Sequence, residues 1–261
     1  MSFEREDVSA VRPPLAPRPA MTAPLSSTAR RAPLMGACAV LALACAAMCP
    51  TTLRADPAPQ IFVGGQTDFA SFGYVGGSVP VFDGFGVRAS GFAGTYQYDG
   101  GPTGPTGRVR GDFSGADLEV IYQYTNANTW VNAGVGASYI DTQLTPFDPG
   151  NRRHGGQTEA IFTLDGGHVW GPWRVDGYGS YGELLDDYSV RGSLTHTLSR
   201  LWRAGLESSA DGDPTYDEER VGPLAALRIG PSSEAAISAG VAHQSGRGDG
   251  GYVRLAFNHS F

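Results

Sequence analysis

The sequence predicts an all-β protein, a single antiparallel transmembrane β-barrel of about 12 strands. Three observations predict this fold. A short apolar segment typical of export signals precedes residue 56, two-residue alternation of apolar and polar side chains recurs beyond it, and the last strand ends on the aromatic residue Phe261. Together they indicate a chain that is exported and then crosses a membrane with strands.

The export signal is an apolar run rich in Ala and Leu at residues 34–47, preceded by the basic pair Arg30 and Arg31. A basic stretch before an apolar run of this length is typical of a secretory signal, and the run is too short to span a bilayer comfortably. Small residues follow, and we expect cleavage between Ala55 and Asp56.

This cleavage divides the chain into an N-terminal extension with its signal peptide, residues 1–55, and a mature outer-membrane barrel, residues 56–261. The proline-containing stretch before Met21 fits no signal peptide, so translation from Met21 instead of Met1 is an open alternative. The expected location of the mature chain is the outer membrane.

The three cysteines, Cys38, Cys45 and Cys49, all lie in or beside the apolar run. The residues before Cys45 loosely resemble a lipobox, so lipidation of Cys45 is an alternative to simple cleavage. If the segment is removed, the mature chain has no thiol for a disulfide, a zinc site or nucleophilic catalysis.

Composition excludes several classes. The formal net charge of −7 provides no basic surface, so we expect no nucleic-acid partner. Only 17% of the residues are charged, which argues against a highly charged disordered chain. No segment after the export signal has the long apolar run that a membrane-spanning helix needs.

Two-residue alternation predicts twelve strands, at residues 60–67, 70–81, 85–98, 110–125, 129–142, 157–169, 172–182, 187–197, 200–209, 217–229, 233–244 and 249–261. In the fifth of these, Val131 and Val135 share one face while Asn132 and Gly134 share the other. A face that carries arginines and carboxylates cannot form a dry core, so we expect it inside a membrane barrel with the apolar face against lipid. A soluble sandwich or lipocalin-like barrel with the faces reversed is the alternative.

The connections alternate in length. Five are short, at residues 82–84, 126–128, 171–172, 198–199 and 230–232. Most of the others are longer and rich in Gly, Pro and Asp, at residues 99–109, 143–156 and 210–216, although those near Asp68 and Asp186 are short. Short periplasmic turns opposite longer loops are typical of outer-membrane barrels, and periplasmic termini require an even number of strands.

The last strand carries the most specific signal. Stepping back by two from the terminal Phe261, past His259, gives Phe257, Leu255 and Val253. A terminal aromatic residue with apolar residues at alternate positions resembles the signal that the barrel assembly machinery reads, although His259 departs from the usual apolar choice. We therefore expect this machinery and outer-membrane lipid as partners.

The inward face of the predicted barrel is charged. The alternation places twelve charged side chains toward the lumen, namely Arg88, Asp117, Glu119, Arg174, Asp176, Arg191, Arg203, Glu207, Arg220, Arg228, Glu234 and Arg254. Two interpretations stay open. The charges either fill a narrow barrel with cross-strand ion pairs, or they line a small hydrophilic channel that selects solutes.

No catalytic, cofactor or metal site is expected. The five histidines show no metal-ligand spacing, and no serine motif suggests the barrel-wall lipid hydrolase that we consider as a third function. An acidic stretch at residues 210–219 carries Asp211, Asp213 and Asp217, which could bind calcium, but its spacing does not match an EF-hand. An ordinary solvated loop is the favoured interpretation.

Several short motifs follow one another along the predicted barrel, namely Ile61–Gly65, Val87–Gly91, Asp148–Asn151, Tyr216–Asp217 followed by Arg220 and Gly222, and Gly250–Tyr252. Together they resemble the cellulose biosynthesis protein BcsS family of outer-membrane barrels. Each motif is short, but their order covers residues 60–261. The resemblance implies a role in cellulose production, with cellulose or cellulose-secretion proteins as partners, and it carries over no enzymatic residue.

We therefore expect a non-enzymatic outer-membrane protein, accessory to bacterial cellulose biosynthesis or export. The alternative is a narrow outer-membrane porin for small hydrophilic solutes.

Overall fold

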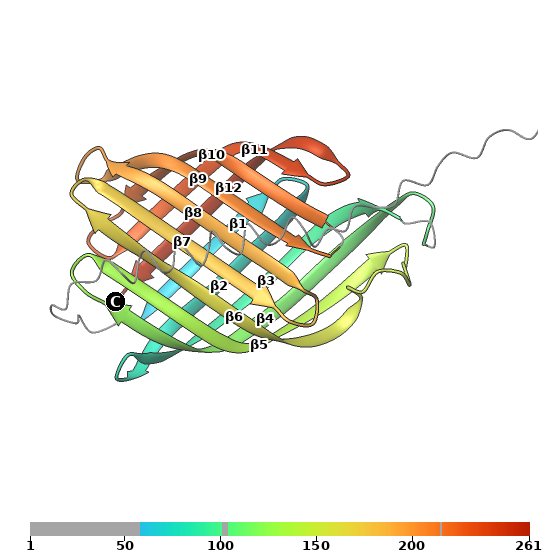
Figure 1. Cartoon of the computed structure of the whole chain (residues 1–261), viewed down its shortest axis with the longest axis horizontal. Helices are drawn as coiled ribbons and strands as arrows, with labels where there is room; N and C mark the ends of the chain where they lie inside the picture. Colours follow the sequence, from blue (N-terminus) through green and yellow to red (C-terminus); the bar gives the residue numbers. More distant parts are fainter. Residues whose placement is uncertain (1–57, 101–103, 215) are drawn as a thin grey trace, which may run out of the picture.

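A computed structural model of the chain describes residues 58–100, 104–214 and 216–261. The described chain forms one closed barrel of twelve antiparallel strands (Figure 1). This confirms the predicted fold class and strand number and rules out the sandwich. The predicted export segment and its cleavage site lie outside the described residues.

The strands are β1 (Gln60–Thr67), β2 (Ala70–Phe82), β3 (Phe85–Asp99), β4 (Arg108–Thr125), β5 (Thr129–Thr145), β6 (Gly155–Trp170), β7 (Trp173–Gly182), β8 (Asp187–Thr197), β9 (Trp202–Asp213), β10 (Tyr216–Arg228), β11 (Ser233–Gln244) and β12 (Gly248–Ser260). Each strand pairs with its neighbours in sequence, and β1 pairs with β12 to close the barrel. Closure satisfies the strand edges that an open sheet would leave unpaired.

The barrel has two different ends. Gln60 and Ser260 pair at the end that also carries the five short connections, which we call the turn end. Gly171 (φ 58°) and Gly230 (φ 90°) occupy left-handed positions in these turns, where a side chain would be strained. The opposite end, the loop end, carries the six other connections. The predicted short turns are thus confirmed.

The strands are unequal in length. β3 to β6 have 15 to 18 residues, whereas β7 has 10. The longer strands project beyond the others at the loop end (Figure 1). One predicted long loop is therefore shorter than expected, because strand pairing extends into it from both sides and leaves only residues 146–154 as the connection between β5 and β6.

Another predicted loop is wrong. Most of residues 210–216 belong to strands, since β9 continues to Asp213 and β10 begins at Tyr216. The two-residue alternation runs on through this acidic stretch, with Asp211 and Asp213 on the inward face, where arginines pair with them. The local sequence indicated a solvated loop because the compensating arginines come from other segments of the chain.

The outward face of the barrel is apolar. Large side chains point outward with much of their surface exposed, for example Val75, Leu118, Val135, Leu206, Val241 and Leu255. Leu206 is 62% exposed, which would be costly for a soluble domain if it were repeated around the whole barrel. Exposed aromatic side chains gather toward the turn end, namely Phe82, Phe85, Trp170, Trp173, Trp202 and Phe261. Such an apolar band with an aromatic edge is typical of barrels that face lipid.

No helix in the described ranges has the length and hydropathy needed to cross a membrane.

The last strand lies between β1 and β11 and turns its apolar positions outward. Val253 and Leu255 are exposed on the outer face, Phe257 is half-buried, and Phe261 follows the strand at the turn end. Recognition of these residues by the assembly machinery stays a prediction.

Candidate functional site: the barrel lumen

The charged lumen is the candidate functional site. Strand register places the inward charges on alternate residues, and most of them meet partners from other strands in ion pairs. All inward side chains of a closed barrel share one interior, the lumen. Their partners therefore come from other strands of the same sheet. Four clusters follow.

The first cluster surrounds Arg88 of β3. Its guanidinium donates to both carboxylate oxygens of Glu119 on β4, at 3.0 Å each, and to Asp165 of β6 at 2.6 Å. Thr163 of β6 bonds to both Arg88 and Glu119, and the Asn132 amide donates to Asp165 at 2.7 Å. A bidentate Arg–carboxylate contact whose neighbouring groups are also hydrogen-bonded is among the strongest forms of ion pair. This cluster therefore links β3, β4, β5 and β6.

The second cluster joins Arg254 of β12 to Glu207 of β9 at 2.6 Å. The hydroxyl of Ser238 donates to the other oxygen of Glu207 at 2.7 Å. Both charged side chains are buried. Their strands are three places apart around the barrel, so the pair bridges part of the lumen and does not simply join neighbouring strands.

The third cluster lies near the loop end around Arg220 of β10. Its guanidinium pairs with Asp68 of the β1–β2 connection at 2.6 Å, with Glu218 at 3.0 Å, and with Asp211 of β9. Arg220 and Asp68 are almost completely buried. One guanidinium thus joins three carboxylates from β9, β10 and the β1–β2 connection.

The fourth cluster lies near the turn end. Arg203 pairs with Glu234 at 2.5 Å and donates to Thr195 at 2.7 Å. On β7, Arg174 pairs with Asp176 at 2.7 Å, and its guanidinium stands 4.5 Å from the centre of the Trp130 ring. A cation over an indole face is held by the ring quadrupole as well as by the carboxylate.

The remaining predicted lumen residues stand apart from these clusters. Asp117 accepts a hydrogen bond from Ser90 at 2.9 Å, and Arg191 lies 5.4 Å from the Tyr178 ring centre. Arg228 is exposed and lines a small cavity of about 70 Å³ together with Arg203 and others at the turn end.

Sequence reasoning missed several partners. Asp165 occupies an inward position of a predicted strand, so strand parity alone could have found it. Asp68 lies in a connection, where alternation carries no information. Arg153, also in a loop, pairs with Asp187 at 2.9 Å and Asp213 at 2.8 Å. Desolvation by burial lowers the pKa of Arg153, but Asp187 and Asp213 outweigh it and raise that pKa above its usual value, so the guanidinium stays charged.

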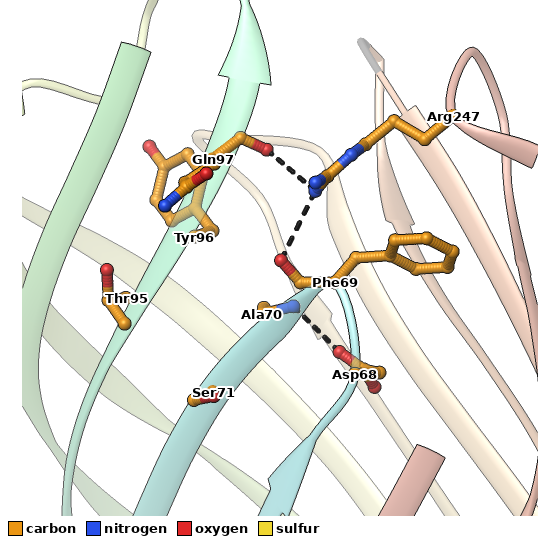
Figure 2. A pocket seen from close by; sticks show the side chains of 8 residues that line it. All are labelled: Asp68, Phe69, Ala70, Ser71, Thr95, Tyr96, Gln97 and Arg247. Carbon is orange, nitrogen blue, oxygen red and sulfur yellow. Dashed lines mark hydrogen bonds between the residues drawn. The ribbon is translucent and has the colours of Figure 1, made fainter. Parts of the chain in front are cut away.

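A separate pocket of about 300 Å³ opens at the rim of the loop end (Figure 2). Arg247, from the β11–β12 connection, donates to the backbone oxygens of Phe69 at 3.2 Å and Gln97 at 3.1 Å. This side chain therefore connects the β11–β12 loop to the β1–β2 loop and to β3 by hydrogen bonds. Tyr96 also lines the pocket.

The described residues hold no group of three or more His, Cys, Asp or Glu side chains placed to bind a metal ion. Asp211, which faces inward, is engaged by Arg220 as described above, whereas Asp217 faces outward and accepts a hydrogen bond from Tyr188 at 2.9 Å. The acidic stretch thus divides between two faces of the barrel and is not a single calcium loop.

One Ser–His contact bears on the hydrolase alternative. Ser233 and His259 Nδ1 are 2.7 Å apart on the outer face at the turn end. Within the described ranges neither side chain has a carboxylate among its hydrogen-bond partners. The contact therefore lacks the third group that orients the histidine in a Ser-His-Asp triad.

Comparison with known protein families decides the identity. The family described as cellulose biosynthesis protein BcsS matches residues 61–261, which include the whole barrel from the second residue of β1 onward. The chain belongs to this family. The resemblance drawn from short sequence motifs is thereby confirmed.

Solved structures similar to this chain are outer-membrane barrels. The KdgM porin in complex with disordered oligogalacturonate is 12% identical, with a TM-score of 0.47, covering 77% of this chain and 99% of that one. The COG4313 outer membrane channel from Pseudomonas putida F1 is 12% identical, with a TM-score of 0.44 over 82% and 100% of the two chains. The translocator domain of the autotransporter NalP from Neisseria meningitidis is 12% identical, with a TM-score of 0.47 over 90% and 97%. Similarity at these scores indicates no shared function.

No curated protein matches the chain significantly.

Proposed function

We propose that this BcsS-family barrel is a non-enzymatic outer-membrane component of bacterial cellulose production, exported through a cleaved signal peptide. The observation that carries the proposal is the family match, because it extends over the whole described barrel and not over one motif. The apolar outer face supports placement in a lipid bilayer, and outward-facing Trp residues near the turn end support an interface there.

The geometry of the lumen supports a binding or guiding role over catalysis. Its buried arginines are engaged by carboxylates, as in the contacts of Arg88, Arg220 and Arg254. A charge that is committed to a structural pair is not available as a general acid or base. We infer that the ion pairs brace the wall and that cellulose, or a cellulose-secretion protein, is the partner.

The test is extracellular cellulose in a clean deletion strain, beside the same strain carrying the intact gene on a plasmid. We expect loss of secreted glucan, restored by the plasmid, at unchanged levels of the cellulose synthase. Unchanged cellulose in the deletion strain would refute the proposal.

A narrow porin for small solutes is the second candidate, and one observation favours it. Several inward carboxylates keep part of their surface in contact with solvent, with Asp176 at 29% and Asp211 at 30% side-chain exposure. Solvent therefore reaches these carboxylates, one near each end of the barrel.

Ion conductance across planar bilayers tests the porin. A porin should conduct, and Arg228→Gln at the turn end should change its ion selectivity, whereas Arg110→Gln on the outer face should not. A barrel that inserts without conducting would exclude this second function.

A further inference from the structure

The inner wall formed by β1 to β4 is rich in aromatic side chains, which lie beside the charged Arg88 of β3 and Asp117 and Glu119 of β4. Six of its inward aromatic rings, which we call the aromatic wall, are Phe62, Phe72, Tyr74, Phe92, Tyr96 and Phe113. A seventh inward ring, Tyr98, donates a hydrogen bond to Asp148 in the β5–β6 connection and is not counted with them. Neighbouring ring centres are separated by 6.3 Å for Phe62 and Tyr74, 6.2 Å for Phe72 and Tyr74, and 6.1 Å for Tyr96 and Phe113. The rings therefore form two groups in contact, and the groups meet on either side of Gly94, with which both Phe72 and Phe113 pair.

Each ring of the aromatic wall stands directly opposite a glycine on the adjacent strand. Tyr74 pairs with Gly64, Phe62 with Gly76, and both Phe72 and Phe113 with Gly94. A Cβ at Gly64 or Gly76 would lie 2.6 Å from carbon atoms of the facing ring. The glycines therefore leave room for the rings to lie over the neighbouring strand instead of standing up into the lumen.

The rings are spread along the strands. Phe62 pairs with Gly76, which pairs with Ser90, and Tyr96 is six residues farther along β3. Six residues of strand extend about 20 Å, which at a strand tilt of about 40° is about 15 Å along the barrel axis, or about half of a hydrocarbon core of about 30 Å. At the loop end, Tyr96 also lines the rim pocket together with Gln97 and Arg247 (Figure 2).

The rings are not buried as a dry core would bury them. All six are only half-buried, whereas Glu207, Arg220 and Arg254 are buried. Packing of aromatics over strand glycines stabilises sheets, and this explains the pairing but not why each ring keeps part of its surface open to the lumen. An apolar surface left open inside a polar lumen marks a place for a ligand.

The opposite wall supplies hydrogen-bonding groups. In a closed barrel of twelve strands, β7 and β8 stand six places from β1 and β2. Their inward residues include the half-buried Ser180, Ser189 and Ser193. Arg174, Asp176 and Arg191 face inward from the same two strands. A ligand in this lumen would therefore meet flat apolar rings on one side and a mixture of hydroxyl and charged groups on the other.

We propose that the aromatic wall binds a β-linked glucan chain lengthwise in the lumen, with sugar rings stacked on Phe72, Tyr74 and Phe113 and hydroxyl groups directed toward β7 and β8. Such a chain is neutral and has apolar ring faces with hydroxyl groups at their edges, which matches the two walls. A charged polymer fits less well, because inward arginines such as Arg88, Arg203 and Arg254 are already paired with carboxylates, which leaves Arg191 and Arg228 as the inward arginines without a carboxylate partner among the described residues. The choice of glucan rests on the proposed function.

Titration calorimetry with cellopentaose tests this proposal on the full barrel in detergent micelles, with maltopentaose as the comparison sugar. We expect binding of cellopentaose and roughly tenfold weaker binding by the double variant Phe72→Leu/Phe113→Leu, since both ring faces over Gly94 are lost. Phe162→Leu, at a lipid-facing position, is the matched control and should bind as the unmodified protein does. All variants are first checked for faster migration of the unheated protein on a gel.

If the barrel binds no cellopentaose, or if the double variant folds and binds it equally well, the proposal is wrong. Equal binding of maltopentaose would overturn the preference for a β-linked chain. A double variant that does not fold is replaced by Tyr74→Leu, which is held to the same criterion. These results are distinct from the deletion phenotype: lost cellulose without sugar binding would refute only this inference, and sugar binding with unchanged cellulose would refute only the proposed function.

Discussion

Substitution of Glu207 by Gln should destabilise the barrel more than any surface change of the same size. The substitution keeps the shape of the side chain but removes the charge that faces Arg254, 2.6 Å away. Arg254 is 8% exposed as a residue, and its other polar contact is a long one of 3.4 Å to the Tyr74 hydroxyl. The guanidinium would therefore remain buried with little compensation.

The expected magnitude follows from this burial. Breaking one side of a buried pair costs about 3 kcal/mol or more, because the remaining charge keeps its desolvation penalty. With a denaturant slope of about 2 kcal/mol per molar urea, the unfolding midpoint should fall by about 1.5 M. The double variant Glu207→Gln/Arg254→Met removes the stranded charge and should recover most of this loss.

The assay is urea unfolding of the barrel in lipid vesicles, followed by the fraction of protein that migrates as the folded form on an unheated gel. The control is Arg110→Gln, because Arg110 pairs with Asp112 on the outer surface, where both side chains are largely exposed. Equal midpoints for Glu207→Gln and Arg110→Gln, or a double variant less stable than Glu207→Gln, would refute the reasoning.

Two further predictions concern the outer face and the final strand. Leu206→Arg places a charge at a lipid-facing position that is 62% exposed, and it should lower the free energy of unfolding in vesicles by about 2–4 kcal/mol. The inward substitution Ser209→Asn is the control and should have little effect on the free energy of unfolding. Equal losses for the two variants would contradict the lipid-facing register. Deletion of Phe261 should reduce the amount of folded barrel in outer-membrane fractions while leaving stability after refolding in vitro nearly unchanged. Normal amounts in the membrane would remove this residue from the assembly signal.

The sequence by itself determined the strands, their order and the faces of the barrel. Strand geometry makes this possible, because successive side chains point to opposite sides and the period of two is visible in any single strand. The inward parity of Arg88, Glu207 and Arg254 could be read in this way, as could the short turns near Gly171 and Gly230. None of these features depends on a distant segment.

Only the tertiary structure decided which groups meet. Glu207 reaches Arg254, and Asp165 reaches Arg88, from strands three places away, at heights set by the register of every strand between them. Phe113 and Gly94 lie on the adjacent strands β4 and β3, and the register of this one pair of strands brings them together in the aromatic wall. Register depends on the whole closed set of strands and their tilt, and no local pattern encodes it. For this reason the charged face was predictable, but the ion-pair clusters and the aromatic wall were not.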